Sequence, residues 1–302
     1  MSADRDHHTG DTKIGRGSVD SFGVRLTRAV DERGPLCVGI DPHPSLLSEW
    51  GMPDTPEGLE RFCRTAIEAL AALVPVLKPQ SAFFERFGSA GIGVLESTIR
   101  HCREAGALVL LDVKRGDIGS TAAAYAQAYL APGAPLRADA ITVHPYLGFG
   151  ALEPFLEVAR ANGGGVFVVA LSSNPEGRTV QRARGGDGRS VAQAVIDEAA
   201  RCNQGAQPLG DVGVVVGATT GGAGQRGTTA DGGLDLGHLN GPVLAPGLGA
   251  QGATGDDLRK IAEGLDGVIL PSSSREILRF GPDPADLREA AKRSLAECRK
   301  VR

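Results

Sequence analysis

The sequence predicts an α/β protein, a closed (β/α)8 TIM barrel, from three observations. Eight short apolar runs, rich in Val, Ile and Leu, each end in polar residues or glycine. Most of these runs are separated by segments with a helical period, and 302 residues suffice for one such barrel. Buried strands that alternate with helices form a parallel sheet. A doubly wound open sheet is the alternative, because sequence alone does not show closure.

The predicted elements follow one another at even spacing. The strands are 36–40, 74–77, 107–111, 139–143, 166–171, 212–216, 242–245 and 267–270, and the clearest helices are 59–73, 94–105, 152–161 and 191–202. Residues 219–240 stand where the sixth helix is expected, but they are rich in glycine. An interior glycine costs a helix roughly 1 kcal/mol, so this helix is expected to be short or missing.

The chain is expected to contain one domain preceded by a tail. Residues 1–18 carry polar side chains and glycines without an apolar period, which predicts a disordered N-terminal tail. Residues 19–302 show even strand spacing and no linker rich in proline or serine. This range is therefore predicted to be a single barrel domain.

The composition excludes several classes of function. The net charge is −4 with dispersed Lys and Arg, and the aromatic content is 4%, so a nucleic-acid surface is not expected. No apolar run approaches the roughly 20 residues of a membrane span, and the start does not resemble a signal peptide. Five scattered cysteines lack a C-x-x-C spacing and are interpreted as reduced packing residues, not metal ligands. We expect a cytoplasmic protein without membrane partners.

The most informative motif is the run from Asp112 to Asp117, which follows the predicted strand 107–111. Asp112 and Lys114 are two apart, so on a continued strand they point to the same side, and Asp117 follows a short turn at Gly116. Two carboxylates around one ammonium could repel an anionic group of a substrate and supply a proton. The alternative is an ordinary salt bridge at the end of a strand.

Other strand ends carry polar residues that would meet at the same end of the barrel. Charges or polar groups follow the early strands, at Asp41, Lys78, His144 and Ser172-Ser173-Asn174. Small residues follow the seventh strand at 246–252, and Arg275 follows the eighth. Backbone N–H groups after strands seven and eight form the usual phosphate site of such a barrel, so a phosphate site is expected here. For 246–252 alone, a tight turn is the alternative.

These motifs together resemble the orotidine 5′-phosphate decarboxylase family, and specifically its longer bacterial subgroup. They occur in the family's order over positions 39–275, and the Lys-Pro-Gln-x-Ala-Phe-Phe-Glu motif is the most specific. The matching segments are Gly39-Ile40-Asp41-Pro42, Lys78-Pro79-Gln80-Ser81-Ala82-Phe83-Phe84-Glu85, Asp112-Val113-Lys114-Arg115-Gly116-Asp117-Ile118, Val143-His144-Pro145-Tyr146, Ser173-Asn174-Pro175 and Pro246-Gly247-Leu248-Gly249-Ala250-Gln251-Gly252.

The resemblance implies decarboxylation of orotidine 5′-monophosphate to uridine 5′-monophosphate and CO2, without a metal or an organic cofactor. Loss of CO2 leaves a vinyl carbanion with no conjugated electron sink, so the site must stabilise negative charge and supply a proton. By resemblance, Lys114 is that cation and proton donor, and Lys78, Asp112 and Asp117 complete the catalytic network, in which Asp112 lies near the substrate carboxylate.

The resemblance also implies how the substrate is bound. The implied contacts are Asp41 with ribose hydroxyls, Ser173 and Asn174 with the pyrimidine, Gln251 and Arg275 with the phosphate beside the loop that contains Gly247 and Gly249, and Thr121 with the neighbouring subunit's substrate. Asp117 and Thr121 would both reach across an interface. A homodimer with shared active sites is therefore expected.

The sequence departs from the family pattern at two places, and two rival functions are open to it. Residues 219–240 lack the acidic helix usual in the subgroup, and Pro271-Ser272-Ser273 replaces a more familiar Val-Asn-Ser. One rival is a magnesium-dependent phosphosugar enzyme of the same barrel group. Those relatives carry Glu as a metal ligand where this chain has Lys78, whose ammonium would repel Mg²⁺. The other rival is a non-catalytic nucleotide-binding barrel, which would have lost one of the four charges.

Overall fold

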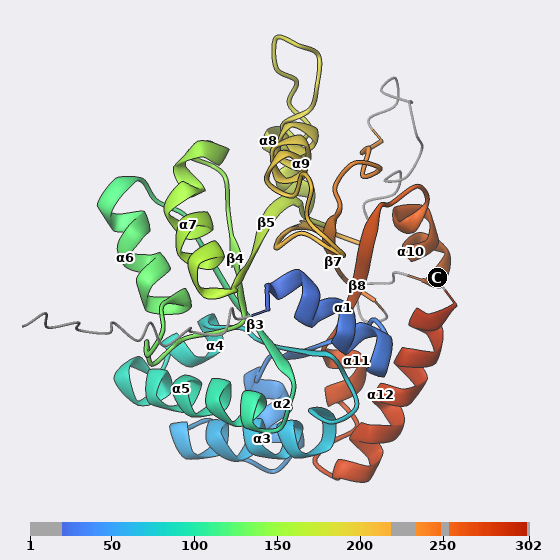
Figure 1. Cartoon of the computed structure of the whole chain (residues 1–302). Helices are drawn as coiled ribbons and strands as arrows, with labels where there is room; N and C mark the ends of the chain where they lie inside the picture. The colour runs from blue at the N-terminus through green and yellow to red at the C-terminus, as the bar shows by residue number, and fades with distance from the viewer. Residues whose placement is uncertain (1–19, 219–232, 249–253, 301–302) are drawn as a thin grey trace, which may run out of the picture.

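Eight parallel strands close into a barrel in the computed structural model, which describes residues 20–218, 233–248 and 254–300 (Figure 1). The strands are β1 Cys37–Ile40, β2 Val76–Pro79, β3 Leu108–Arg115, β4 Ala140–Val143, β5 Gly165–Leu171, β6 Val212–Val216, β7 Gly241–Pro246 and β8 Gly267–Ser273. Each strand pairs with its neighbour in the sequence, and β8 pairs with β1 through Cys37↔Ser272 and Val38↔Ser273. This closure confirms the TIM barrel and excludes the open sheet.

The predicted strands all exist, and β6 has the predicted bounds. The main difference is at β3, which continues four residues past Leu111 to Arg115 and carries the charged run within it. Hydrogen bonding to β4 explains the extension, since Arg115 pairs with Val143 after a register shift that begins at Leu111. A bulge of this kind kinks a strand and re-aims its side chains.

Helices cover the outside of the barrel (Figure 1). They are α1 Phe22–Arg33, α2 Pro44–Glu49, α3 Pro56–Leu70, α4 Ala82–Glu85, α5 Gly88–Glu104, α6 Gly119–Leu130, α7 Glu153–Asn162, α8 Arg178–Gln181, α9 Val191–Cys202, α10 Gly255–Ala262, α11 Arg275–Leu278 and α12 Pro284–Arg299, with short 3-10 turns at Phe149–Leu152 and Pro175–Gly177. Of the predicted helices, 191–202 has the observed bounds, and the other three differ by one to six residues at their ends.

The helix α3 shows how the sequence places this outer layer. Thr55 caps its N-terminus by accepting a hydrogen bond from the Gly58 N–H, and Pro56 occupies the first turn. Its buried face, which includes Leu59 and Phe62, packs toward the barrel between α5 and α12. Each large apolar side chain buried in this way contributes about 1.5–3 kcal/mol.

The helix α1 closes the amino-terminal end of the barrel. Phe22, Leu26 and Val30 pack against inward-facing strand residues such as Leu110 and Phe167. The rings of Phe22 and Phe167 meet edge to face, with centroids 5.9 Å apart. Apolar packing at this end leaves the carboxyl ends of the strands as the side where polar groups gather.

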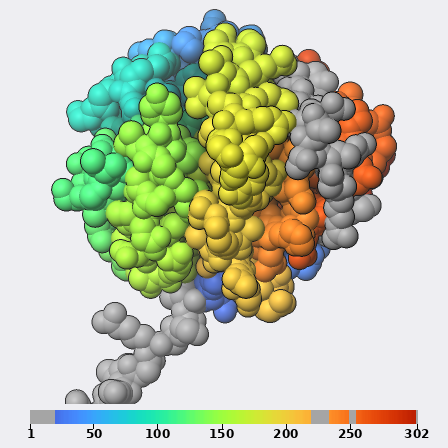
Figure 2. All heavy atoms as spheres, turned by 90° about the horizontal axis from the view of Figure 1, so that it is seen from above, coloured from blue at the N-terminus to red at the C-terminus, as the bar shows by residue number. Residues whose placement is uncertain are grey.

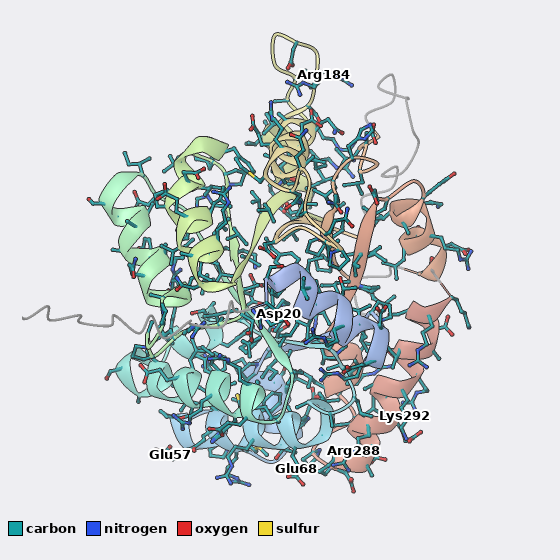
Figure 3. The ribbon with its side chains drawn as sticks, in the orientation of Figure 1. Asp20, Glu57, Glu68, Arg184, Arg288 and Lys292 are labelled. Atoms are coloured by element: carbon teal, nitrogen blue, oxygen red, sulfur yellow. The ribbon has the colours of Figure 1, made fainter. Side chains whose placement is uncertain are left out.

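The long connecting segment between β5 and α9 extends from the carboxyl end of the barrel. It contains α8, and Arg184 lies at its tip (Figure 3). In the view from above, this yellow segment runs across the face of the molecule (Figure 2). Residues 174–189, in which glycines alternate with arginines, belong to this segment.

Two sequence expectations concern parts of the chain that the structure describes only partly or not at all. The tail 1–18 lies outside the described residues, as does 219–232. Within 233–240 the chain forms no helix, and Asp235 is instead held by two hydrogen bonds to the Gln193 side chain of α9. Among the described helices, none combines the length and apolar character needed to cross a membrane.

Candidate active site

A cavity of about 400 Å³ opens at the carboxyl ends of the strands. Its walls come from segments far apart in the sequence, including the ends of β1, β2, β3 and β7. The predicted site residues that line it are Asp41, Lys78, Asp112, Lys114, Gly247 and Arg275. Six of the twelve predicted site residues therefore meet at one place.

Four of these side chains form a chain of alternating charge. The Lys78 ammonium lies 4.0 Å from Asp41 Oδ1 and 3.3 Å from Asp112 Oδ2. The Lys114 ammonium lies 2.6 Å from Asp112 Oδ1 and 2.7 Å from Asp112 Oδ2. The fourth charged side chain in this row is thus Asp41, whereas the sequence prediction placed Asp117 in the network.

The two central charges, Lys78 and Asp112, are buried and hold each other ionised. Burial lowers the pKa of the Lys78 ammonium, but the Asp41 and Asp112 carboxylates outweigh it and raise that pKa above its ordinary value. Burial raises the pKa of Asp112, but Lys78 and Lys114 outweigh it and lower that pKa well below its usual range. Both groups are therefore charged at neutral pH. Because they are buried away from water, their electrostatic interactions are stronger than at the surface.

Lys114 differs from the other three charged side chains of the site in exposure and in backbone conformation. About half of its side chain is exposed at the cavity, so its ammonium can meet a ligand. Its backbone has φ 43°, the left-handed region that costs a non-glycine residue roughly 1–2 kcal/mol. This conformation falls within the bulge between Leu111 and Arg115, so the strand irregularity aims the lysine at Asp112.

Thr142 of β4 is a site residue that the sequence analysis missed. It lines the cavity, its hydroxyl donates a hydrogen bond to Asp112 Oδ1 at 2.7 Å, and it accepts one from the Lys114 N–H at 3.0 Å. The signal in the sequence was a single polar residue inside the otherwise apolar strand Ala140–Val143. His43 was missed as well, and its ring packs edge to face on Phe83 at 4.3 Å in the same cavity.

Two polar atoms in the β1 and β8 side of the cavity wall make no hydrogen bond among the described residues. They are Asp41 Oδ1 and Ser274 Oγ, and both are buried. A buried polar atom left unsatisfied costs about 1–3 kcal/mol, so such atoms in a cavity wall are suited to a ligand that carries hydroxyl groups. Arg275, at the start of α11, adds a positive charge on this side.

Comparison with known proteins identifies the family. The model of the orotidine 5′-phosphate decarboxylase / HUMPS family matches residues 34–290, most of the chain. The chain belongs to this family. It is 63% identical over 281 residues to the orotidine 5′-phosphate decarboxylase of Salinispora arenicola, covering 93% of this chain and 98% of the relative. The Streptomyces coelicolor enzyme of the same name is 56% identical over the same shares.

Solved structures agree with this family membership. The chain is similar to a crystal structure from Streptomyces avermitilis described as a candidate orotidine 5′-phosphate decarboxylase, with TM-score 0.84 and 53% identity over 94% of this chain and 96% of the other. It is also similar to the Leishmania donovani OMP decarboxylase, with TM-score 0.70 and 31% identity over 93% and 98%. The resemblance to the decarboxylase family inferred from the motifs is confirmed.

Four of the remaining predicted positions do not line the cavity of this single chain: Asp117, Thr121, Ser173 and Asn174. Asp117 accepts a hydrogen bond from the Ile118 N–H, and Thr121 is exposed in the first turn of α6. Ser173 and Asn174 are exposed at the base of the segment that rises above the barrel, where Asn174 bonds to Ser172 and Glu176. Gly249 and Gln251 fall outside the described residues.

His144 packs against the backbone instead of lining the cavity. A Cβ atom placed on Gly116 would lie 2.7 Å from the His144 ring and 2.6 Å from the His144 carbonyl oxygen. The His144 N–H donates to the Arg115 carbonyl at 2.9 Å. This close contact explains the glycine in the charged run.

Proposed function

We propose that this chain converts orotidine 5′-monophosphate to uridine 5′-monophosphate and CO2, with Lys114 as the proton donor. The observation that carries the proposal is the ammonium of Lys114 at the cavity, 2.6 Å from the buried Asp112 carboxylate. In the reaction, the bond between the pyrimidine ring and its carboxylate breaks and the electron pair stays on the ring carbon. A proton from Lys114 Nζ then forms the new C–H bond.

The alternating charges supply the electrostatics of this step. Asp112 is kept ionised by its two lysine partners, so it repels the carboxylate of the bound substrate. This repulsion is relieved when the carboxylate leaves as CO2. Lys114 stabilises the developing carbanion and is oriented before the substrate arrives. Lys78 holds Asp112 charged from the buried side.

The rest of the nucleotide fits the remaining walls. Asp41, whose buried Oδ1 makes no hydrogen bond among the described residues, would accept hydrogen bonds from ribose hydroxyls. Arg275 and Gly247, which line the cavity, would hold the phosphate together with Gly249 and Gln251. Ser173 and Asn174 would reach the pyrimidine when the segment above the barrel closes.

The direct test is a spectrophotometric assay with the purified full chain and orotidine 5′-monophosphate. Loss of the substrate with stoichiometric formation of uridine 5′-monophosphate is the expected result. Binding without turnover would instead support the non-catalytic nucleotide-binding barrel.

Activity is expected to persist after exhaustive chelation. Lys78 places an ammonium between Asp41 and Asp112, where a divalent cation would be repelled by its charge. Turnover of orotidine 5′-monophosphate should therefore be the same before and after dialysis against EDTA. A preparation silenced by EDTA and restored by Mg²⁺ would favour the phosphosugar branch of the family.

Replacing Arg275 by alanine should raise KM by about 10- to 100-fold, because one charge-assisted contact to the phosphate is lost. A smaller loss of kcat is expected if phosphate binding closes the segment above the barrel. Arg279→Ala is the matched control, since Arg279 lies one turn further and pairs with Glu276 at the surface. Equal effects of the two substitutions on KM would contradict the assignment of Arg275.

We also propose a homodimer in which Asp117 and Thr121 complete the partner's site. Large apolar side chains are exposed beside them, with Ile118 61%, Tyr146 76% and Leu147 52% exposed. The loops that carry these residues meet where Gly116 packs on His144, so the three residues belong to one region of the surface. Exposed apolar residues gathered in this way are typical of a protein interface.

A further inference from the structure

The position of Lys114 depends on a hydrogen bond from outside its own strand. The β3 ladder with β4 is interrupted between Leu111 and Arg115, and Lys114 adopts φ 43° within that interruption. Its backbone N–H therefore donates to the Thr142 side chain, at 3.0 Å, instead of to a main-chain carbonyl of β4. The strained backbone of the proposed proton donor is thus held by a hydroxyl group.

The same hydroxyl also holds the carboxylate beside the proton donor. A hydroxyl has one hydrogen, and because Thr142 Oγ1 accepts from Lys114, this hydrogen is available for Asp112 Oδ1 at 2.7 Å. Thr142 is 1% exposed and β-branched, so its side chain is restricted to few rotamers. One rigid group therefore ties the backbone of Lys114 to the carboxylate that its ammonium contacts.

We propose that Thr142 is a positioning residue that sets the geometry of the Lys114 ammonium against the Asp112 carboxylate. This inference rests on the proposed decarboxylase function. Without the hydroxyl, the Lys114 N–H loses its acceptor and Asp112 Oδ1 loses a donor, while the residues assigned to ribose and phosphate keep their places. The defect should therefore fall on the chemical step and leave substrate binding largely intact.

Thr142→Val removes the hydroxyl with little change of volume, and we expect kcat to fall by roughly 10- to 100-fold, the usual effect of losing a group that orients a functional side chain. KM should stay within about 3-fold of the wild type. Thr142→Ser restores the hydroxyl without the methyl group, and its kcat should lie within about 3-fold of the wild type. Should Thr142→Val fail to fold, Thr142→Ala removes the same hydroxyl without crowding and should show the same loss of kcat.

Thr98→Val is the matched control, because Thr98 is 2% exposed but its hydroxyl bonds to the Val94 carbonyl within α5, away from the cavity. It should leave both kinetic constants unchanged. The inference is overturned if Thr142→Val keeps the wild-type kcat, if its defect lies in KM alone, or if Thr142→Ser is as impaired as Thr142→Val. Absence of turnover by the wild-type chain would instead count against the proposed function, so the two failures are distinguishable.

Discussion

Replacing Lys114 by alanine is expected to lower kcat by about 10³- to 10⁶-fold. The substitution removes both the proton donor and the cation that faces the developing carbanion, and such groups account for losses of this size. Because the substitution leaves the residues assigned to the phosphate and the ribose unchanged, KM should change much less than kcat. Single-turnover measurements with orotidine 5′-monophosphate would separate the chemical step from binding.

Lys292→Ala is the control, because it removes a lysine charge far from the proposed site. Lys292 lies on α12, away from the strand ends, and pairs with Glu289 at the surface (Figure 3). It should show wild-type kinetics. Near-normal turnover by Lys114→Ala would remove Lys114 from the role of proton donor.

Mixing two inactive homodimers is expected to restore activity. If Lys114 serves its own barrel and Asp117 serves the partner's, then a mixed dimer of Lys114→Ala and Asp117→Ala chains has one site with both substitutions and one with neither. After subunit exchange, activity should reach at most roughly half of the native value per mixed dimer, by the statistics of closed two-fold assemblies. The measurement is the recovery of turnover with time after mixing, with exchange followed by mass spectrometry or fluorescence.

Asp112→Ala provides a control for this experiment. Asp112 contacts Lys114 within one chain, so mixing Lys114→Ala with Asp112→Ala leaves every site with one defect. No activity should return in that mixture. If the mixture with Asp117→Ala also stays inactive after verified exchange, Lys114 and Asp117 serve the same subunit and the shared-site hypothesis is wrong.

The fold could be predicted because buried strands and helices have recognisable apolar patterns in the sequence. Each strand of a TIM barrel is covered on both faces, so it appears as a continuous apolar run, and β6 has the predicted bounds for this reason. The helix α9 has the predicted bounds because its buried face gives a helical apolar period. The extension of β3 to Arg115 could not be predicted in the same way. It depends on hydrogen bonds across a register shift, and an apolar pattern carries no information about them.

The site was predictable where function depends on charge placed at a strand end. Asp41, Lys78, Asp112 and Lys114 meet as expected, because parallel strands deliver their carboxyl ends to one face. Thr142 escaped prediction, since a lone threonine in a strand is usually a packing residue and only its two hydrogen bonds reveal more. The roles of Asp117, Thr121, Ser173 and Asn174 stay predictions, because these residues lie outside the cavity of one chain.

The buried ion pair of Lys78 and Asp112 has a consequence for how this site can change over generations. Replacing one partner alone leaves the other charge buried with a single opposite charge, because Lys114 stays beside Asp112 and Asp41 stays beside Lys78. The remaining charge keeps the loss of stability below the roughly 3–5 kcal/mol that follows when a buried charge loses its sole partner. A lineage that departs from this chemistry one substitution at a time therefore loses part of its stability margin at the first step, which favours keeping the alternating charges together.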